Sequence, residues 1–196
     1  ITKHVLRAAP LSSSSSSASG QQSQSQQSQQ LQQARLVSFQ LDLTDCLIND
    51  SVLELILTRW GSRLDLLRLD GTYITERGLA LLELCPNLRV LSLSRCWNIL
   101  HKSEANRCIM PAVNRMSLLR EVHISDTRLS GRMLSDHPSL RLQVLMSARC
   151  PISVHAVRML AEMCGDTLQA LSFSGCAFVN TKCMHYLVKF AQLETI

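Results

Sequence analysis

The feature that most constrains the fold is a pattern of apolar residues that repeats from about residue 36 onward. Each copy reads Leu-x-x-Leu-x-Leu-x-x-Cys/Thr, and then Ile-x-(Asp/Glu)-x-x-Leu followed by residues of helical spacing. Six copies match; their first positions, with the start of a seventh, are residues 38, 64, 88, 119, 142, 168 and 193. The periods are therefore 26, 24, 31, 23, 26 and 25 residues, which indicates an array of stacked structural repeats.

Two periodicities within each copy predict how a repeat folds. Leu91 and Leu93 alternate with one residue between them, so both face one side of a short strand. Leu79 and Leu82 have helical spacing, so a helix can cover the strands. One such unit cannot bury its apolar face alone, whereas stacked units can. The pattern predicts a curved α/β solenoid with a parallel strand ladder inside and helices outside, and extra residues of the longer third repeat within residues 100–116.

The eight cysteines do not have the spacing of a disulfide scaffold or of paired metal ligands. No Cys-x-x-Cys pair occurs, and several cysteines fall at the ninth position of the repeat, where Thr alternates with them. We interpret them as reduced, buried, small hydrophobic residues near turn backbone that needs hydrogen-bond partners. A disulfide between Cys150 and Cys176 is a minor alternative. Reduced cysteines favour the cytoplasm or nucleus.

The chain divides into three segments by composition. Residues 1–9 mirror the start of a repeat helix and are expected to close an earlier repeat. Residues 10–35 are almost entirely Ser and Gln, and we expect a disordered insertion or linker there. Residues 36–196 form the repeat domain. The first residue, Ile1, and the seventh repeat that stops at Ile196 suggest a fragment of a longer protein. The chain contains no apolar run of the roughly 20 residues that span a bilayer.

The repeats resemble the cysteine-containing leucine-rich repeat. The strongest matches are Leu88-Arg89-Val90-Leu91-Ser92-Leu93-Ser94-Arg95-Cys96-Trp97-Asn98-Ile99 and Leu168-Gln169-Ala170-Leu171-Ser172-Phe173-Ser174-Gly175-Cys176. The resemblance covers about residues 36–196 and implies a leucine-rich-repeat solenoid of the ribonuclease-inhibitor-like kind. The best-known proteins with these repeats are F-box proteins, the substrate receptors of SCF ubiquitin ligases. Membership would imply that the repeats capture a protein substrate while an F-box binds the Skp adaptor.

No F-box-like helical segment occurs in this sequence. A Skp adaptor and a cullin would therefore bind only through an F-box outside this chain. The alternative is an adaptor or inhibitor with the same repeats and no link to ubiquitin, similar to the mitotic-exit antagonists of that repeat type.

The exposed strand positions are the candidate protein-binding residues, because solenoids bind partners on the concave face. The fifth and eighth positions carry charges of both signs, which suits a polar protein partner. Trp97 directly follows a strand and is either an exposed aromatic anchor or packed on the neighbouring turn. The alternative for the charged residues is an ordinary solvated surface. The candidates are Asp42, Arg68, Asp70, Arg95, Trp97, His123, Asp126 and Arg149.

Other functional classes find little support in the sequence. No nucleophile elbow, phosphate loop or His-Glu-x-x-His motif occurs, so we expect no enzyme, no cofactor and no catalytic residue. Cys176, Cys183 and His185 do not have standard zinc spacing, so no metal is expected. Residues 102–158 hold nine Lys or Arg against four Asp or Glu, which could attract an acidic partner or merely be solvated. This stretch lacks stacking aromatic residues, so we expect no nucleic-acid binding.

Overall fold

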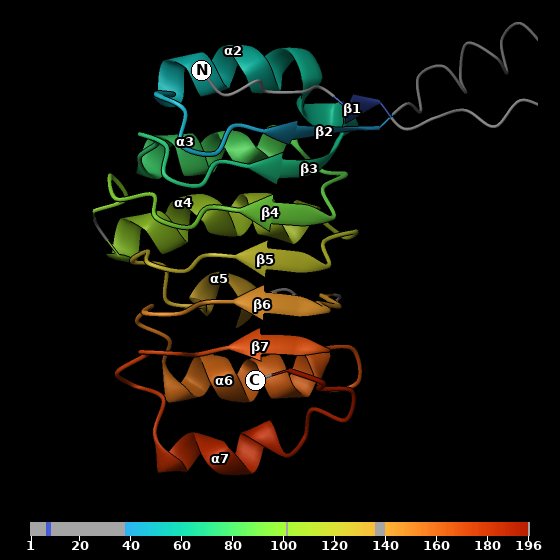
Figure 1. Cartoon of the computed structure of the whole chain (residues 1–196), viewed down its shortest axis with the longest axis vertical. Helices are drawn as coiled ribbons and strands as arrows, with labels where there is room; N and C mark the ends of the chain where they lie inside the picture. The colour runs from blue at the N-terminus through green and yellow to red at the C-terminus, as the bar shows by residue number, and fades with distance from the viewer. Residues whose placement is uncertain (1–6, 9–37, 101, 136–139, 196) are drawn as a thin grey trace, which may run out of the picture.

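The structure, a computed structural model, describes residues 7–8, 38–100, 102–135 and 140–195. These residues form one sheet with helices along one side of it (Figure 1). The strands are β1 (Arg7–Ala8), β2 (Phe39–Asp42), β3 (Leu64–Arg68), β4 (Val90–Ser92), β5 (Glu121–His123), β6 (Val144–Met146) and β7 (Ala170–Ser172). The α-helices are α2 (Asp50–Trp60), α3 (Glu76–Leu81), α4 (Lys102–Arg115), α5 (Arg132–Ser135), α6 (Val154–Cys164) and α7 (Thr181–Leu187). Two 3-10 turns, η1 (Gly61–Arg63) and η2 (Leu82–Leu84), follow α2 and α3.

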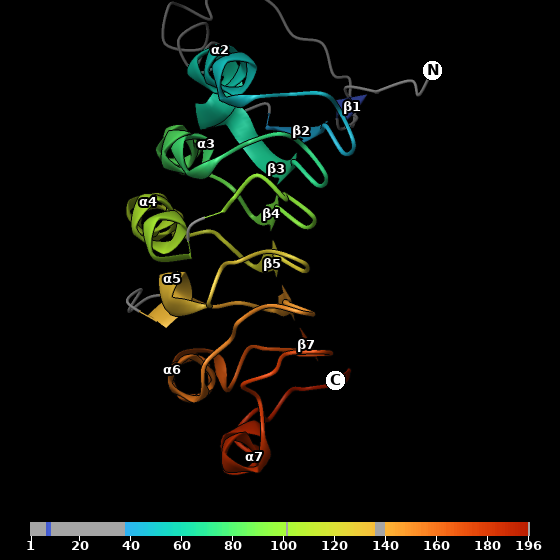
Figure 2. The same ribbon diagram turned by 90° about the vertical axis from the view of Figure 1, so that its left-hand side faces the viewer.

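The strands lie in sequence order, and from β2 to β7 they are parallel. Equivalent repeat positions pair: Leu67 lies opposite Leu91, and Leu91 opposite Val122. β1 pairs with β2 in the antiparallel direction. Figure 2 shows the strand column and the helix column bowed toward the helix side, so the exposed face of the ladder is concave. The fold is therefore an α/β leucine-rich-repeat solenoid, as the periodicity predicts.

The core lies between the ladder and the helices. The inward strand residues Leu67, Leu69, Leu91 and Leu93 are completely buried. The helix residues that face them, such as Leu79, are buried as well. Removing such a side chain to alanine typically costs about 2–5 kcal/mol. Each repeat therefore depends on its neighbours for the apolar contacts that stabilise it.

Polar side chains fix where the helices begin. Asn49 caps α2, since its side chain accepts a hydrogen bond from the Val52 amide at 3.1 Å. Ser153 caps α6 through the Ala156 amide at 3.2 Å. Such caps typically contribute about 1 kcal/mol each.

Two helices end at a glycine, and the reason differs from the usual one. Gly61 and Gly165 follow α2 and α6, and both have right-handed backbone rather than the left-handed cap that favours glycine. A Cβ at Gly61 would lie 2.7 Å from the Leu84 carbonyl oxygen. One at Gly165 would lie 3.0 Å from the carbonyl oxygen of Lys189, in the segment after α7. Both glycines therefore permit a close approach of backbone segments.

The third and fourth repeats differ in their helices. The extra residues of the third repeat lie in α4, which has 14 residues against 11 in α2 and α6. α4 lies in the outer layer of helices, so the insertion does not cover the concave face (Figures 1 and 2). α5 has only four residues. The Ser/Gln-rich segment 10–35, and residues 1–9 apart from Arg7–Ala8, lie outside the described part of the chain.

Candidate protein-recognition surface

The fifth positions of the repeats form a column across the exposed face of the ladder. Asp42 lies opposite Arg68, and His123 opposite Met146, in the strand register. The Arg68 guanidinium lies 3.9 Å from the Asp42 carboxylate, so these two candidates form an ion pair. Both side chains are about half exposed, so the ion pair adds little to the stability of the fold and mainly orients the two side chains.

Glu121 is the nearest charged neighbour of His123 on this face. The His123 Nε2 lies 3.8 Å from a Glu121 carboxylate oxygen. Nε2 makes no hydrogen bond with any described residue, although it is shielded from solvent. This nitrogen is therefore a polar group that a partner could reach only by displacing its neighbours.

The eighth positions form a second column, at the edge of the sheet where the strands end. All six residues in this column have left-handed backbone, with φ between 55° and 70°. They are Asp45, Gly71, Arg95, Asp126, Arg149 and Gly175. This conformation turns the chain away from the strand in each repeat, and it repeats because the backbone hydrogen bonds between adjacent turns repeat. Left-handed backbone favours glycine, so each charged residue at this position adds backbone strain that a glycine would not have.

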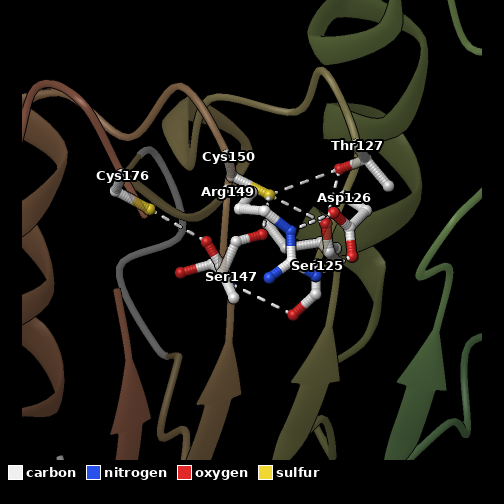
Figure 3. Close-up of polar contacts among 9 residues, drawn as sticks. Ser125, Asp126, Thr127, Ser147, Arg149, Cys150 and Cys176 are labelled. Atoms are coloured by element: carbon white, nitrogen blue, oxygen red, sulfur yellow. Dashed lines mark hydrogen bonds and ion pairs between the residues drawn. The ribbon is translucent and has the colours of Figure 1, made fainter. Parts of the chain in front are cut away.

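Two ion pairs run along this edge. Arg95 lies 3.3 Å from Asp45, which is two repeats away. Gly71 stands between them, and a Cβ there would lie 2.2 Å from the Asp45 Oδ1. Arg149 donates from Nε and from a terminal nitrogen to the two oxygens of Asp126 (Figure 3). The hydrogen bond from Arg149 lowers the pKa of Asp126 below its usual value. The structure therefore pairs two candidates, Asp126 and Arg149, with each other, and pairs the candidate Arg95 with Asp45, which was not among the candidates.

Asp70 organises the backbone at the same edge. Its Oδ1 accepts hydrogen bonds from the Ser92 hydroxyl at 2.5 Å and from the Ser94 amide at 2.7 Å. These bonds link the second repeat to the third. Asp70 therefore acts as a structural link between turns, a role that its position in the repeat pattern does not distinguish from that of the other candidates.

The ninth-position residues lie beneath the turns and hydrogen-bond to the backbone, as predicted. The Cys96, Cys150 and Cys176 thiols donate to the sixth-position carbonyls of the preceding repeats, at 3.1, 2.9 and 3.0 Å. The hydroxyl of Thr127 instead donates to its own strand, at 2.6 Å from the Ile124 oxygen. Burial raises the pKa of the Cys96 thiol to about 11, so the thiol remains protonated and donates.

All eight cysteines are free, and six of them are buried. No disulfide joins Cys150 to Cys176; both act as hydrogen-bond donors in the same column (Figure 3). Cys183 is buried, whereas His185 is exposed and its ring lies against that of Tyr186, tilted by 47° with 3.8 Å between ring centroids. Among the residues that the structure describes, no group of three potential ligands is arranged to hold a metal ion.

Trp97 is exposed at the strand-end edge. Its side chain is 64% exposed, and it borders a shallow hollow of about 280 Å³. Buried Cys96 and Thr127 lie at the base of the hollow, and the Asp126–Arg149 pair lines another side. Tyr73 and Leu47, the equivalent residues of the preceding repeats, are 52% and 84% exposed. The three residues form an apolar ridge on consecutive turns, next to the charged eighth-position column.

A larger groove lies on the outer side of the solenoid and was not predicted. It has a volume of about 940 Å³ and lies between α4 and the start of α5. Met110 and Pro111 contribute apolar surface, and Arg107 a charge. The groove adjoins the shortest α-helix of the described residues, α5. Sequence analysis missed it because Leu129 and Leu134 have the spacing of an ordinary repeat helix.

Three arginines at the opposite edge of the sheet, where the strands begin, were also missed. They are Arg89 in the third repeat, Arg120 in the fourth, and Arg141 at the end of the fourth, just before the fifth repeat begins at residue 142. The signal was present, since Leu88-Arg89, Leu119-Arg120 and Leu140-Arg141 each place Arg after a buried Leu. The repeat pattern predicts exposed binding residues at the fifth and eighth positions, and these arginines occupy neither.

Comparisons with known proteins add little to this description. No protein-family model and no curated protein matches the chain. One solved structure similar to the chain is that of TLR13 in complex with ssRNA13, with 17% identity and a TM-score of 0.43. The match covers 79% of this chain and 24% of TLR13, so the chain spans about a quarter of that protein's length. No helix among the described residues has the length and apolar character to cross a bilayer. The fold assignment therefore rests on the strand ladder and repeat register, and the function on the surface described above.

Proposed function

We propose that this chain is a protein-recognition module that binds its partner on the concave face and the strand-end edge of the ladder. The exposure of Trp97 on an ordered turn carries this proposal. A large aromatic side chain that lies mostly in water contributes little to folding, whereas the same side chain is a frequent anchor in protein interfaces.

The surroundings of Trp97 support the same reading. The ion pair Asp126–Arg149 restrains two charged side chains that line the same hollow as Trp97, and Asp45–Arg95 restrains two more along the same edge. A partner that contacts them would lose less side-chain entropy than if they were free. The Trp97, Tyr73 and Leu47 ridge adds apolar area next to a polar border, which is the usual composition of an interface.

We further propose that the partner is a substrate of an SCF ubiquitin ligase. The support is the resemblance of the repeats, with Cys at the ninth position, to those of F-box proteins; in this chain three of these thiols donate to backbone carbonyls. A Skp adaptor and a cullin would join through an F-box in another part of the full-length protein. The eight free cysteines favour a reducing compartment, the cytoplasm or nucleus.

Affinity purification of the tagged full-length protein from its source cells tests both levels. We expect a Skp adaptor, a cullin and a substrate with the wild-type protein. Trp97→Ala should lose the substrate and keep the adaptor. Trp60→Ala is the matched control, since Trp60 is the other tryptophan and is 40% exposed at the end of α2.

The outcomes separate the two levels. Recovery of a stable protein partner without any Skp adaptor would overturn the ubiquitin-ligase role and favour an adaptor or inhibitor. Equal recovery of the partner with Trp97→Ala and Trp60→Ala would overturn the proposed binding surface.

A further inference from the structure

The edge of the sheet where the strands begin carries three arginines, each shortly before one of the strands β4, β5 and β6. We call Arg89, Arg120 and Arg141 the arginine edge. The Arg120 amide donates to the Arg89 carbonyl at 2.8 Å, so these two occupy the same position in adjacent repeats. Their backbones are therefore about 5 Å apart, as in any ladder. Arg141 lies two residues before Gln143, whose amide donates to the Arg120 carbonyl at 2.7 Å.

These three cations lack carboxylate partners among the described residues. The Arg120 guanidinium donates to the Leu119 carbonyl at 2.8 Å. That of Arg141 donates to the Leu140 carbonyl at 2.9 Å and to the Met163 carbonyl, in the last turn of α6, at 3.4 Å. Arg89 is exposed, and its side chain makes no hydrogen bond or ion pair with any described residue. The strand-end edge is different, because its Arg95 and Arg149 are both neutralised by aspartates.

The neighbouring acids do not remove this excess of positive charge. Glu121 lies beside His123, at 3.8 Å. Asp65 precedes Arg89 in the same position of the second repeat, but its Oδ1 is buried without a partner and its Oδ2 accepts from Ser38 at 3.4 Å. The next residue along the column, Gln143, is neutral. The positive stretch is therefore confined to the third and fourth repeats.

We propose that the arginine edge docks an acidic segment of the protein partner, with Asp or Glu carboxylates placed against the guanidinium groups. The proposal rests on the protein-recognition function above and assigns the charge of that partner. Guanidinium groups bind carboxylates through paired, charge-assisted hydrogen bonds. Arg120 and Arg141 are already oriented by carbonyl oxygens that leave their charge uncompensated. Ordering them on binding therefore costs little entropy.

An acidic peptide fits this edge better than a nucleic acid does. Single-strand binders combine a basic groove with aromatic side chains on which bases stack. The arginine edge and its column neighbours, Asp65 and Gln143, contain no aromatic residue, and Trp97 lies at the opposite edge. The positive stretch also spans only two repeats, with Asp65 at one end.

Fluorescence anisotropy with the purified chain tests the proposal directly. The probe is a fluorescein-labelled peptide of alternating Glu and Ser, and the comparison probes are a Lys and Ser peptide and a single-stranded oligonucleotide of similar length. The variant is Arg89→Glu, which breaks no hydrogen bond or ion pair among the described residues and so should fold normally. Arg77→Glu is the matched control, since Arg77 is an exposed arginine on α3 with no such side-chain bond.

We expect the Glu peptide to bind the wild-type chain, and Arg89→Glu to weaken that binding about tenfold. Arg77→Glu should change it less than about twofold. Binding should also weaken as salt rises from about 0.05 M to about 0.3 M. Equal losses for Arg89→Glu and Arg77→Glu would overturn the proposal. Tighter binding of the Lys peptide or of the oligonucleotide than of the Glu peptide would overturn it as well.

This experiment can fail independently of the proposed function. Purification of the full-length Arg89→Glu variant supplies the comparison. Loss of the natural partner with Trp97→Ala but not with Arg89→Glu would overturn the arginine edge and leave the recognition function in place. Absence of any protein partner with the wild-type chain would overturn the recognition function itself, and the peptide titration would still decide the charge preference of the edge.

Discussion

The Asp50 carboxylate joins the first two repeats by accepting two hydrogen bonds from Thr75. One comes from the Thr75 amide at 2.9 Å and the other from its hydroxyl at 2.5 Å. Both residues stand where a repeat helix begins, so the acidic position in Ile-x-(Asp/Glu) ties one helix start to the next. In the following pair of repeats the carbonyl oxygen of the Asn106 side chain does the same for Ser130.

Asp50→Ala should destabilise the folded chain by about 2 kcal/mol, because it leaves the half-buried Thr75 amide and hydroxyl without their charged partner. Urea unfolding followed by circular dichroism measures the loss. Glu54→Ala, an exposed acid one turn later in α2, is the control and should change the free energy of unfolding by less than about 0.5 kcal/mol. Similar values for the two variants would contradict the role of Asp50.

Gly71→Ala should destabilise the chain by about 1–3 kcal/mol, because the backbone there has φ +66° and the new Cβ would meet the Asp45 Oδ1. Part of this loss depends on Asp45. Combining Gly71→Ala with Asp45→Ala should therefore cost less than the sum of the two single variants. Strict additivity in this double-mutant cycle would show that the two positions are not in contact.

The Asp126 carboxyl should titrate at a lower pH than a free aspartate, because Arg149 donates two hydrogen bonds to its charged form. Its ion pair therefore stabilises the folded state above the unfolded pKa of about 4 and is lost as pH falls through the lower folded pKa. NMR titration of the side-chain carboxyl measures this. Arg149→Gln should raise the pKa of Asp126 toward its usual value, and an unchanged pKa would argue against the pair.

Cys85 and Cys96 should not react with iodoacetamide in the native chain at about pH 8, since the thiolate is the reactive form. Burial raises the pKa of Cys85 to about 12 and that of Cys96 to about 11. Mass spectrometry of peptides before and after denaturation measures their modification. Both should be alkylated only after unfolding; rapid alkylation of either in the native chain would mean that its repeat is open.

The repeat register could be predicted because the same inward position, such as that of Leu91, is apolar and buried in each repeat. Other features depend on contacts between side chains of different repeats. The pair Asp45–Arg95 forms because Gly71 between them has no side chain, and this requires three repeats to be considered at once. The one-turn length of α5 was likewise hidden by a normal apolar pattern. For Trp97 the sequence allowed either a packed or an exposed side chain, and only the path of the neighbouring turns decides this.

Site-specific photo-cross-linking in the full-length protein tests most directly whether the surface around Trp97 binds a protein. A photo-reactive benzoylphenylalanine would replace Arg128, which lines the hollow beside Trp97, and in a control protein Arg77 on α3. We expect a protein adduct from position 128 in the source cells, none from position 77, and loss of the adduct when Trp97→Ala is added. An adduct that persists with Trp97→Ala, or one that forms only from position 77, would contradict recognition at this surface.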